Sequence, residues 1–397
     1  MMKNQHRLRR FLTNAYAFRF FDQLIFFYPL FTIFFVENGV PDSNVSLLLI
    51  IWALSVMAAQ IPVAAFASIL RPKTLVIFGQ LMKISCFALW FLWPTFGGFA
   101  IGFMLWGIQW AIDATVFETL LYDELRALKK KSIYAKICGR QAFVGAIAAM
   151  IATSGSLMLF LGYGFVVAIT AICIAMSVLF ILRMENSSPS AARSAGLRIG
   201  KTMKLSMKIL KQSPHLAMLL TLLCLLGAIN AFDDYIGLIG TDLGVPVEFV
   251  GGLFLMNVFC KNTGKLIAHK FEKVKDWIFF AGMFTLAGLF AGASAIYTMP
   301  ALPLIGCMFF VQGILIVLAM SRFQHGISSS CRIMMLSIIS IFSNVFTIGM
   351  YMLVGGGILL GGYSWSLGLL GAVCVIAGIW AAMFMGKQKR VKCEVEC

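Results

Sequence analysis

The chain has 397 residues, of which 60% are hydrophobic and only 12% are charged, and its mean hydropathy is +0.92. Soluble globular domains carry about 25% charged residues, so this composition excludes a water-exposed globular surface and indicates an integral membrane protein. The formal net charge is +16, but no RNP motif or zinc finger accompanies it, which argues against a nucleic-acid partner.

Long uncharged segments predict transmembrane helices. Residues 47–70 and 141–182 carry no charge, and residues 74–110 contain one, Lys83. Runs longer than about 18 apolar residues are typical of spans, and the alternating ten-residue pattern of barrel strands is missing. We therefore expect an all-α protein with about twelve helices, at roughly 15–37, 44–69, 74–94, 97–122, 138–160, 163–183, 214–240, 247–268, 276–297, 301–322, 333–355 and 363–385.

The distribution of Lys and Arg predicts the orientation. The predicted outer loops contain neither residue, whereas the alternate loops and both termini are rich in them. By the positive-inside rule, both termini face the cytoplasm. We expect a multi-pass protein of the bacterial inner membrane in contact with the lipid bilayer.

A basic hydrophilic stretch at 184–213 predicts a cytoplasmic linker between two six-helix halves. The N-terminal half would be 1–183 and the C-terminal half 214–386, followed by a cytoplasmic tail at 387–397. The linker's lysines and apolar residues have the spacing of a basic amphipathic helix on the inner leaflet. It is either a lipid-sensing element or an interfacial linker that obeys the positive-inside rule.

Six spans, a basic loop and six more spans resemble the major facilitator superfamily over essentially the whole chain. The loop at 64–73 is similar to that family's G-x-L-A-D-R-x-G-R-K motif but matches it only at Ala67 and Lys73. A second decayed copy lies at 264–270, about half a chain further on. The family motif holds the cytoplasmic side through charge contacts, and Ser68 brings no negative charge to them.

The fourth predicted span gives a more specific resemblance. Residues 118–125 read Glu-Thr-Leu-Leu-Tyr-Asp-Glu-Leu, and residues 18–22 of the first span read Phe-Arg-Phe-Phe-Asp. Together they resemble a bacterial subgroup of facilitators whose fourth span ends in an E-A-L-L-Y-D-type stretch. The resemblance implies a transporter that works as a monomer by alternating access around a central cavity. The alternative of a membrane-embedded enzyme has little support, because the sequence offers no clustered His or Cys ligands and no G-x-S-x-G motif.

Charged residues inside spans are the candidate site residues, because each costs about 2.5–3.5 kcal/mol on insertion scales unless it meets a partner or a cavity. Arg19 and Asp22 lie three apart on the first span and share a face, so they can pair. Asp22 is either a cavity carboxylate that binds a cation or proton, or part of an ion pair that aids assembly. Arg19 is a candidate gate residue. We expect Lys83 in the third span to pair with Asp113 in the fourth.

Asp113, Glu118 and Asp123 follow at intervals of five in the fourth span. Five residues of an α-helix turn about 140° past a full turn, so these carboxylates do not share one stripe. We expect Asp113 and Glu118 to serve substrate or proton binding. Asp123 is expected to meet Arg126 or Arg140 as a gate pair.

Three polar residues of the seventh span are further candidates. Asn230 is deep enough to line a cavity, whereas Asp233 and Asp234 are expected near the outer surface. The two carboxylates form either an outer gate or a solvated helix end. Polar residues later in the chain line the cavity or join helices; they are Asn257, Gln312 and Asn344.

Cofactor chemistry has no support in the sequence. The ten cysteines form no C-x-x-C pair, the four histidines form no H-E-x-x-H, and we expect no cofactor and no metal. Because no Walker A loop is present either, ion coupling is favoured over ATP hydrolysis.

The predicted function is a secondary active transporter of a small solute, coupled to protons, with export favoured over import. Asp22 and Asp113 are the candidate protonation sites. A non-transporting receptor or scaffold with a decayed transporter fold is one alternative, and a solute or siderophore importer is another. Mixed charge in the predicted cavity leaves cations, zwitterions and amphipathic molecules open as substrates.

Overall fold

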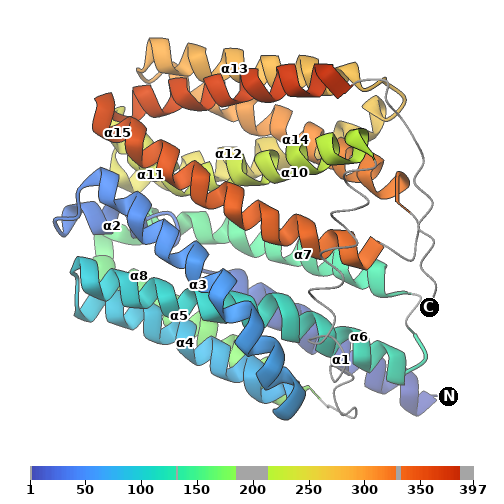
Figure 1. The fold of residues 1–397 in the computed structure, drawn as a ribbon. Helices are drawn as coiled ribbons and strands as arrows, with labels where there is room; N and C mark the ends of the chain where they lie inside the picture. The colour runs from blue at the N-terminus through green and yellow to red at the C-terminus, as the bar shows by residue number, and fades with distance from the viewer. Residues whose placement is uncertain (1, 131–132, 185–212, 328–331, 385–397) are drawn as a thin grey trace. The chain divides into compact units, whose positions relative to one another are not determined.

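The computed structural model describes residues 2–130, 133–184, 213–327 and 332–384, and every regular element within these ranges is a helix. Figure 1 shows the helices in chain order. Almost all of the predicted linker at 184–213 and all of the tail at 387–397 lie outside the described residues, as does the side chain of Ser68.

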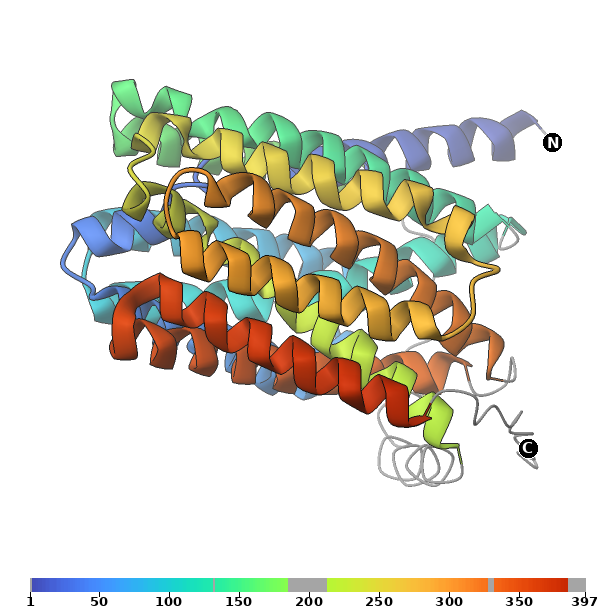
Figure 2. The same ribbon diagram turned by 90° about the horizontal axis from the view of Figure 1, so that it is seen from above.

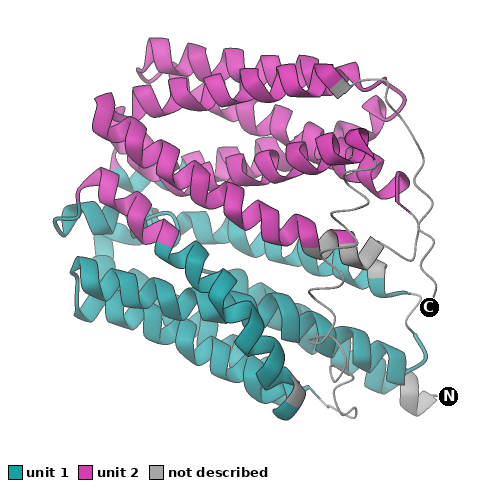
Figure 3. Cartoon of the chain, viewed as in Figure 1, with its two compact units in different colours: residues 1–40, 51–197, 247–252 teal, residues 41–50, 198–246, 253–397 magenta. Residues whose placement is uncertain are grey.

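The chain divides into two compact units (Figure 3), of which unit 1 is residues 1–40, 51–197 and 247–252, and unit 2 is residues 41–50, 198–246 and 253–397. Two short segments therefore belong to a different unit from their sequence neighbours. In unit 2, Asp42 accepts a hydrogen bond from Tyr363 at 2.8 Å. In unit 1, the Gly251 amide donates to Ser156 Oγ at 3.0 Å.

Unit 1 is built from helices whose ends carry ordinary start and stop signals. Pro72 occupies the first turn of its helix, where its missing N–H costs nothing, and Thr95 Oγ1 accepts from the Gly98 amide at 3.4 Å. α1 packs against α7 and α8, and α4 packs against α5 and α8. The elements are α1 (Met2–Gln23), α2 (Phe31–Glu37), most of α3 (Asp42–Ile69), α4 (Pro72–Leu92), α5 (Phe96–Ile112), the π-helix η1 (Asp113–Phe117), α6 (Glu118–Ala127), α7 (Tyr134–Ala152), the 3₁₀ turns η3 (Thr153–Gly155) and η4 (Leu157–Leu161), and α8 (Tyr163–Arg183).

Unit 2 contains the remaining helices, and its α13 runs beside the C-terminal part of α15 in both ribbon views (Figures 1 and 2). α10 packs against α14 and α15. The elements are α10 (Pro214–Asn230), the 3₁₀ turn η7 (Ala231–Tyr235), α11 (Ile236–Asp242), α12 (Val250–Ile267), the 3₁₀ turn η9 (Ala268–Phe271), α13 (Trp277–Ile296), α14 (Ala301–His325) and α15 (Arg332–Phe384), with the short turn η8 (Val247–Phe249) in unit 1.

α15 is two spans joined by a sharp reversal. Gly361 and Gly362 have non-helical backbone angles, and Gly362 has φ +81°, which a glycine adopts without strain. A Cβ at Gly357 would lie 2.6 Å from Ser366 Oγ, so the chain after the reversal returns against the helix before it.

The predicted set of twelve spans agrees with this fold. Nine helical segments in the described ranges are long and apolar enough to cross a membrane, and one of them, Ile338–Met383, holds the two spans of α15. The broken first span, α1 with α2, and α12 complete the set. The prediction of an all-α membrane protein with about twelve helices in two halves is confirmed.

Gly264 of the second decayed loop motif has a packing role. A Cβ at this residue would lie 2.2 Å from the Phe310 carbonyl oxygen, so α12 and α14 touch backbone to backbone. Gly264→Ala should destabilise the protein by about 1–3 kcal/mol, because the helices must separate. Gly288→Ala in α13 is the control, since a Cβ there meets nothing within 4 Å in the described structure. Thermal unfolding of both purified variants in detergent would test this; equal midpoints would contradict the close contact.

Candidate functional site

The first span is interrupted beside a buried carboxylate. α1 ends at Gln23, and residues 24–30 form turns before α2 begins. Asp22, in the last turn of α1, is 1% exposed. Lys83 from α4 reaches it with its ammonium 2.7 Å from Asp22 Oδ1 and 2.8 Å from the Asp22 carbonyl oxygen. Lys83 therefore binds both a carboxylate and the C-terminal end of an interrupted helix, where a positive charge is favourable.

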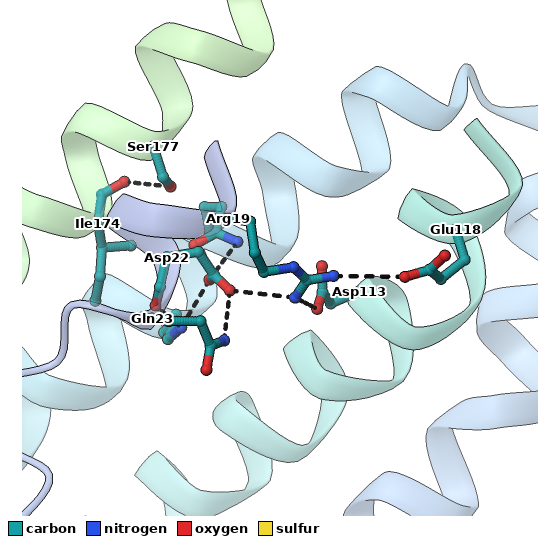
Figure 4. Close-up of polar contacts among 9 residues, drawn as sticks. Arg19, Asp22, Gln23, Asp113, Glu118, Ile174 and Ser177 are labelled. Atoms are coloured by element: carbon teal, nitrogen blue, oxygen red, sulfur yellow. Dashed lines mark hydrogen bonds and ion pairs between the residues drawn. The ribbon is translucent and has the colours of Figure 1, made fainter. Parts of the chain in front are cut away.

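Arg19, one turn earlier on α1, connects this pair to the fourth span (Figure 4). Its Nη1 lies 2.7 Å from Asp113 Oδ2 and 3.7 Å from Asp22 Oδ2, and its Nη2 lies 3.6 Å from Glu118 Oε1. The guanidinium also stands over the ring of Phe117, 5.2 Å from its centroid. One arginine thus contacts three carboxylates from two spans.

A π-helix brings two of those carboxylates to the same side. The fourth span changes from α5 to the π-helix Asp113–Phe117 and then to α6, which Glu118 begins. We expected Asp113 and Glu118 to face different directions, which is wrong, because that expectation assumed α-helical periodicity. The wider π turn, which closes from residue i to i+5, lets both side chains reach Arg19.

The expected pairing of Lys83 with Asp113 is also wrong. Lys83 pairs with Asp22, and Arg19 takes Asp113. The reason is the interruption of α1, which places a carboxylate and a backbone carbonyl of Asp22 together within reach of α4. Arg19, predicted as a gate residue, therefore lies in one cluster with the residues predicted to bind substrate or protons.

The predicted gate pair of Asp123 does not form. Arg126 and Arg140 are exposed, and within the described ranges no ion pair joins either of them to Asp123. The adjacent carboxylate, Glu124, is instead 1% exposed and forms an ion pair with Arg7 of α1. The buried carboxylate that forms an ion pair is therefore Glu124, one residue further along α6 than the predicted Asp123.

The unit 1 cluster has an excess of negative charge. The cations Arg19 and Lys83 face the carboxylates Asp22, Asp113 and Glu118. Counted over these five side chains, the formal charge is one negative unit. Four of the five side chains are at most 15% exposed, whereas Glu118 is 37% exposed and is partly screened by solvent. The negative excess on a largely buried cluster makes it suited to the uptake of one proton or one monovalent cation.

The three carboxylates are not equally suited to that uptake. Both oxygens of Asp22 accept hydrogen bonds, Oδ1 from Lys83 and Gln80 and Oδ2 from Gln23. Asp113 Oδ2 accepts from Arg19, but its Oδ1 is buried and has no hydrogen-bond partner among the described residues. A proton on Asp113 Oδ1 would therefore leave the Arg19 contact in place.

One face of α7 completes the surroundings of Glu118. The Tyr134 hydroxyl donates to Glu118 Oε2 at 3.0 Å, and a Cβ at Gly145 would lie 3.6 Å from the Arg19 side chain. Gln141 lies between them on the same face of the helix, because positions 134, 141 and 145 fall within a narrow arc at 100° per residue. Gln141 is 2% exposed, and neither of its amide atoms has a partner in the part of the chain described.

Unit 2 contains a second interruption with a second Lys–Asp pair. α10 ends at Asn230, and the chain passes through a 3₁₀ turn before α11. Lys261 of α12 donates to Asn230 Oδ1 at 2.7 Å and to Asp233 Oδ2 at 2.5 Å. Asp234 points elsewhere and accepts from the Tyr351 hydroxyl at 2.9 Å.

Asp233, predicted near the outer surface, lies within the seventh span of the structure. α11 continues the span to Asp242, so Asp233 lies roughly 14 Å before its end at 1.5 Å per residue. Lys261 lies within α12, and its side chain is 13% exposed. The 3₁₀ turn that bends the span at Asp233 brings the carboxylate toward α12.

The two interruptions occupy corresponding places, at the first span of each half. Each carries an aspartate next to the break and a lysine from another helix that binds it: Lys83 with Asp22, and Lys261 with Asp233. Interrupted helices in corresponding positions of two repeats are the strongest local indication of a binding site in transporter folds.

A charged cluster at the ends of three unit 2 helices escaped the sequence reasoning. Asp276, just before α13, accepts from Arg322 of α14 and lies 2.9 Å from His215 Nε2 of α10. Arg322 also donates to the Val274 carbonyl and stands over the Phe279 ring. The hydrogen bond from His215 and the nearby Arg322 charge hold the pKa of Asp276 below its usual range. This cluster ties the helix ends together.

One of the missed residues had a usable signal in the sequence. Lys261 falls inside the predicted span 247–268, so the reasoning applied to Lys83 would have found it. Glu124 and Asp276 lie at span ends, where a charge is unremarkable, and Gln141 is uncharged. No group of three His, Cys, Asp or Glu side chains within the described ranges is placed to hold a metal ion.

Comparison with known proteins shows which solved structures share this architecture. No protein-family model and no curated protein sequence matches the chain. Among solved structures it is similar to the nucleoside transporter NupG, with a TM-score of 0.72 and 15% identity over 94% of this chain and 98% of that one. It is also similar to a D-xylose-proton symporter, with a TM-score of 0.69 and 12% identity over 95% of this chain and 97% of that one.

A third similar structure is a bacterial homolog of the human lysosomal transporter Spinster, with a TM-score of 0.67 and 13% identity over 97% of this chain and 96% of that one. The chain has the major facilitator fold. Identities this low establish the fold alone. Within the major facilitator fold, the two Lys–Asp pairs lie on the first and third spans and on the seventh and eighth.

Proposed function

We propose that the protein is a proton-coupled secondary transporter of a small solute and that Asp113 carries the coupling proton. The observation behind this proposal is the unit 1 cluster, in which three carboxylates face two cations and Asp113 Oδ1 is buried without a donor. The similar structures named as a nucleoside transporter and a D-xylose-proton symporter support movement of a small solute.

Protonation of Asp113 changes the balance around Arg19. With Asp113 charged, Arg19 is attracted to three carboxylates; with Asp113 neutral, two remain, and the Arg19 contact weakens. Because the cluster joins α1 to the fourth span, the proton alters the strength of a contact between two spans. We propose that the solute changes the strength of this contact and that this change couples solute movement to proton movement. The two halves would then give alternating access.

The test is transport by the wild-type protein in proteoliposomes that contain a pH-sensitive dye. With an imposed pH gradient, sugars, nucleosides, amino acids, siderophores and cationic drugs are added one at a time. We expect one solute class to change the internal pH, and protein-free liposomes are the control. Antiport, which corresponds to export, remains the prediction for direction, and the sign of the pH change decides it.

Two results would contradict the proposal in different ways. If a solute crosses the membrane without moving protons, the protein is a transporter but is not coupled to protons. A solute that binds the purified protein but does not cross the membrane would favour the alternative of a non-transporting receptor. The decayed loop motif at 64–73 is the observation behind that alternative.

A further inference from the structure

Unit 2 has a polar site with more hydrogen-bond acceptors than donors. Asn257 and Gln312 are each 1% exposed, and the side-chain oxygen of each is buried without a donor among the described residues. Asp233 Oδ1 is likewise buried without a donor among the described residues. Three buried oxygens without donors are unfavourable in an empty site, because each has lost its contact with water.

The three oxygens belong to one contact region of α10, α12 and α14. Asn257 lies one turn before Lys261 on the same face of α12, and Lys261 binds Asn230 and Asp233. The Lys261 ammonium also stands over the ring of Phe309, one turn before Gln312 on α14.

Two further contacts keep α14 close to this region. Gln312 Nε2 donates to the Leu226 carbonyl of α10 at 2.7 Å, one turn before Asn230, which also sets the orientation of its amide. A Cβ at Gly313 would lie 2.3 Å from the Lys261 carbonyl oxygen. Asp233 is therefore bound to the Lys261 ammonium, and Asn257 and Gln312 lie on α12 and α14, one turn from Lys261 and from Phe309 respectively.

The charge of this region restricts the ligand. The Lys261 ammonium is matched by the Asp233 carboxylate, so a charged solute would leave an uncompensated charge in a buried site. Two of the three N–H groups of Lys261 are used by Asn230 and Asp233, which leaves one donor for a ligand. The buried part of the site, Asn257, Gln312 and the Lys261–Asp233 pair, thus offers several acceptors and one donor without net charge. The ammonium of Lys265, one turn further along α12, is exposed and lies within electrostatic range of Lys261 and Asp233.

We infer that this region of unit 2 binds a neutral, hydroxyl-rich solute, of the class of sugars and nucleosides. Each hydroxyl donates one hydrogen bond and accepts others, which matches an excess of acceptors together with one N–H donor. The inference rests on the proposed transporter function and names its substrate class. It places solute recognition on Asn257, Gln312 and the Lys261–Asp233 pair, apart from the proton on Asp113.

The experiment is equilibrium binding to the purified full-length protein in detergent, by calorimetry and thermal shift. The probes are D-xylose and uridine as hydroxyl-rich neutral solutes, with L-lactate and putrescine as charged ones. We expect the wild type to bind a hydroxyl-rich probe and neither charged probe. Binding of a charged probe alone would overturn the inference.

Asn257→Leu is the decisive variant. It removes a buried oxygen that has no donor, so the thermal midpoint without ligand should stay the same or rise, while affinity for the bound probe should fall at least tenfold. Asn262→Leu is the matched control, because Asn262 lies on the same helix about 140° away from Asn257 and should bind like the wild type. Unchanged affinity in Asn257→Leu would overturn the inference.

Binding and proton coupling, both measured on the wild-type protein, separate this inference from the proposed function. Failure of coupling in the wild type with binding intact would reject the proton proposal alone, and failure of binding with proton-coupled transport of another solute would reject this inference alone.

Discussion

Lys83→Met should destabilise the folded protein by about 3–5 kcal/mol, the cost of removing one partner from a buried ion pair. Lys83 is 2% exposed, and its ammonium binds both the carboxylate and the carbonyl oxygen of Asp22. Without it, Asp22 retains Arg19 at 3.7 Å but loses its direct cation, and the end of α1 loses a donor. The measurement is the thermal midpoint in detergent together with the yield of folded protein.

The double variant Lys83→Met with Asp22→Asn tests the cause. It removes both charges of the pair, so it should recover most of the loss, because no unpaired charge stays buried. Lys136→Met, at an exposed position of α7, is the control and should match the wild type. A Lys83→Met protein as stable as the wild type, or a double variant no better than the single one, would show that the pair does not hold the interrupted helix.

Asp113→Asn should abolish proton-driven accumulation of solute while it leaves solute exchange at equilibrium largely intact. An amide cannot take up a proton at this site, but it can still accept from Arg19 through its oxygen. The cluster then has two cations and two carboxylates and resembles the protonated state permanently. Internal pH and labelled solute, followed in the same proteoliposomes, would show the separation of coupling from exchange.

The control for Asp113→Asn lies on the next helix of the same span. Asp123→Asn makes the same chemical change at a half-exposed residue without an ion pair in the described structure, and it should transport and couple like the wild type. Glu118→Gln is informative as well, because Glu118 also contacts Arg19 but its side chain is 37% exposed. Full proton-driven accumulation in Asp113→Asn would reject Asp113 as the proton carrier.

The positions of the helices along the chain could be predicted because they depend on local composition. An apolar run of about 20 residues must form a hydrogen-bonded helix in lipid, whatever its neighbours are. The uncharged run at 47–70 therefore lies almost entirely in α3, and the run at 141–182 covers most of α7 and α8 with the 3₁₀ turns between them. The same local property showed which charges lie within apolar runs, so Lys83 and Asp113 were found as candidates.

The partners of those charges could not be predicted, because they depend on departures from regular helix. The π-helix at Asp113–Phe117 turns Asp113 and Glu118 to one side, and the break after Gln23 brings Asp22 within reach of Lys83. A hydropathy pattern analysed at 100° per residue assumes a regular α-helix, so it shows neither the π-helix nor the break in α1.

The sequence by itself determined a membrane-embedded all-α protein, its spans and the residues that carry charge inside them. Only the tertiary structure decided that Lys83 binds Asp22, that Arg19 joins three carboxylates, and that Lys261 binds Asp233. The physical reason is that burial in lipid acts on each segment separately, whereas an ion pair forms between helices far apart in the chain.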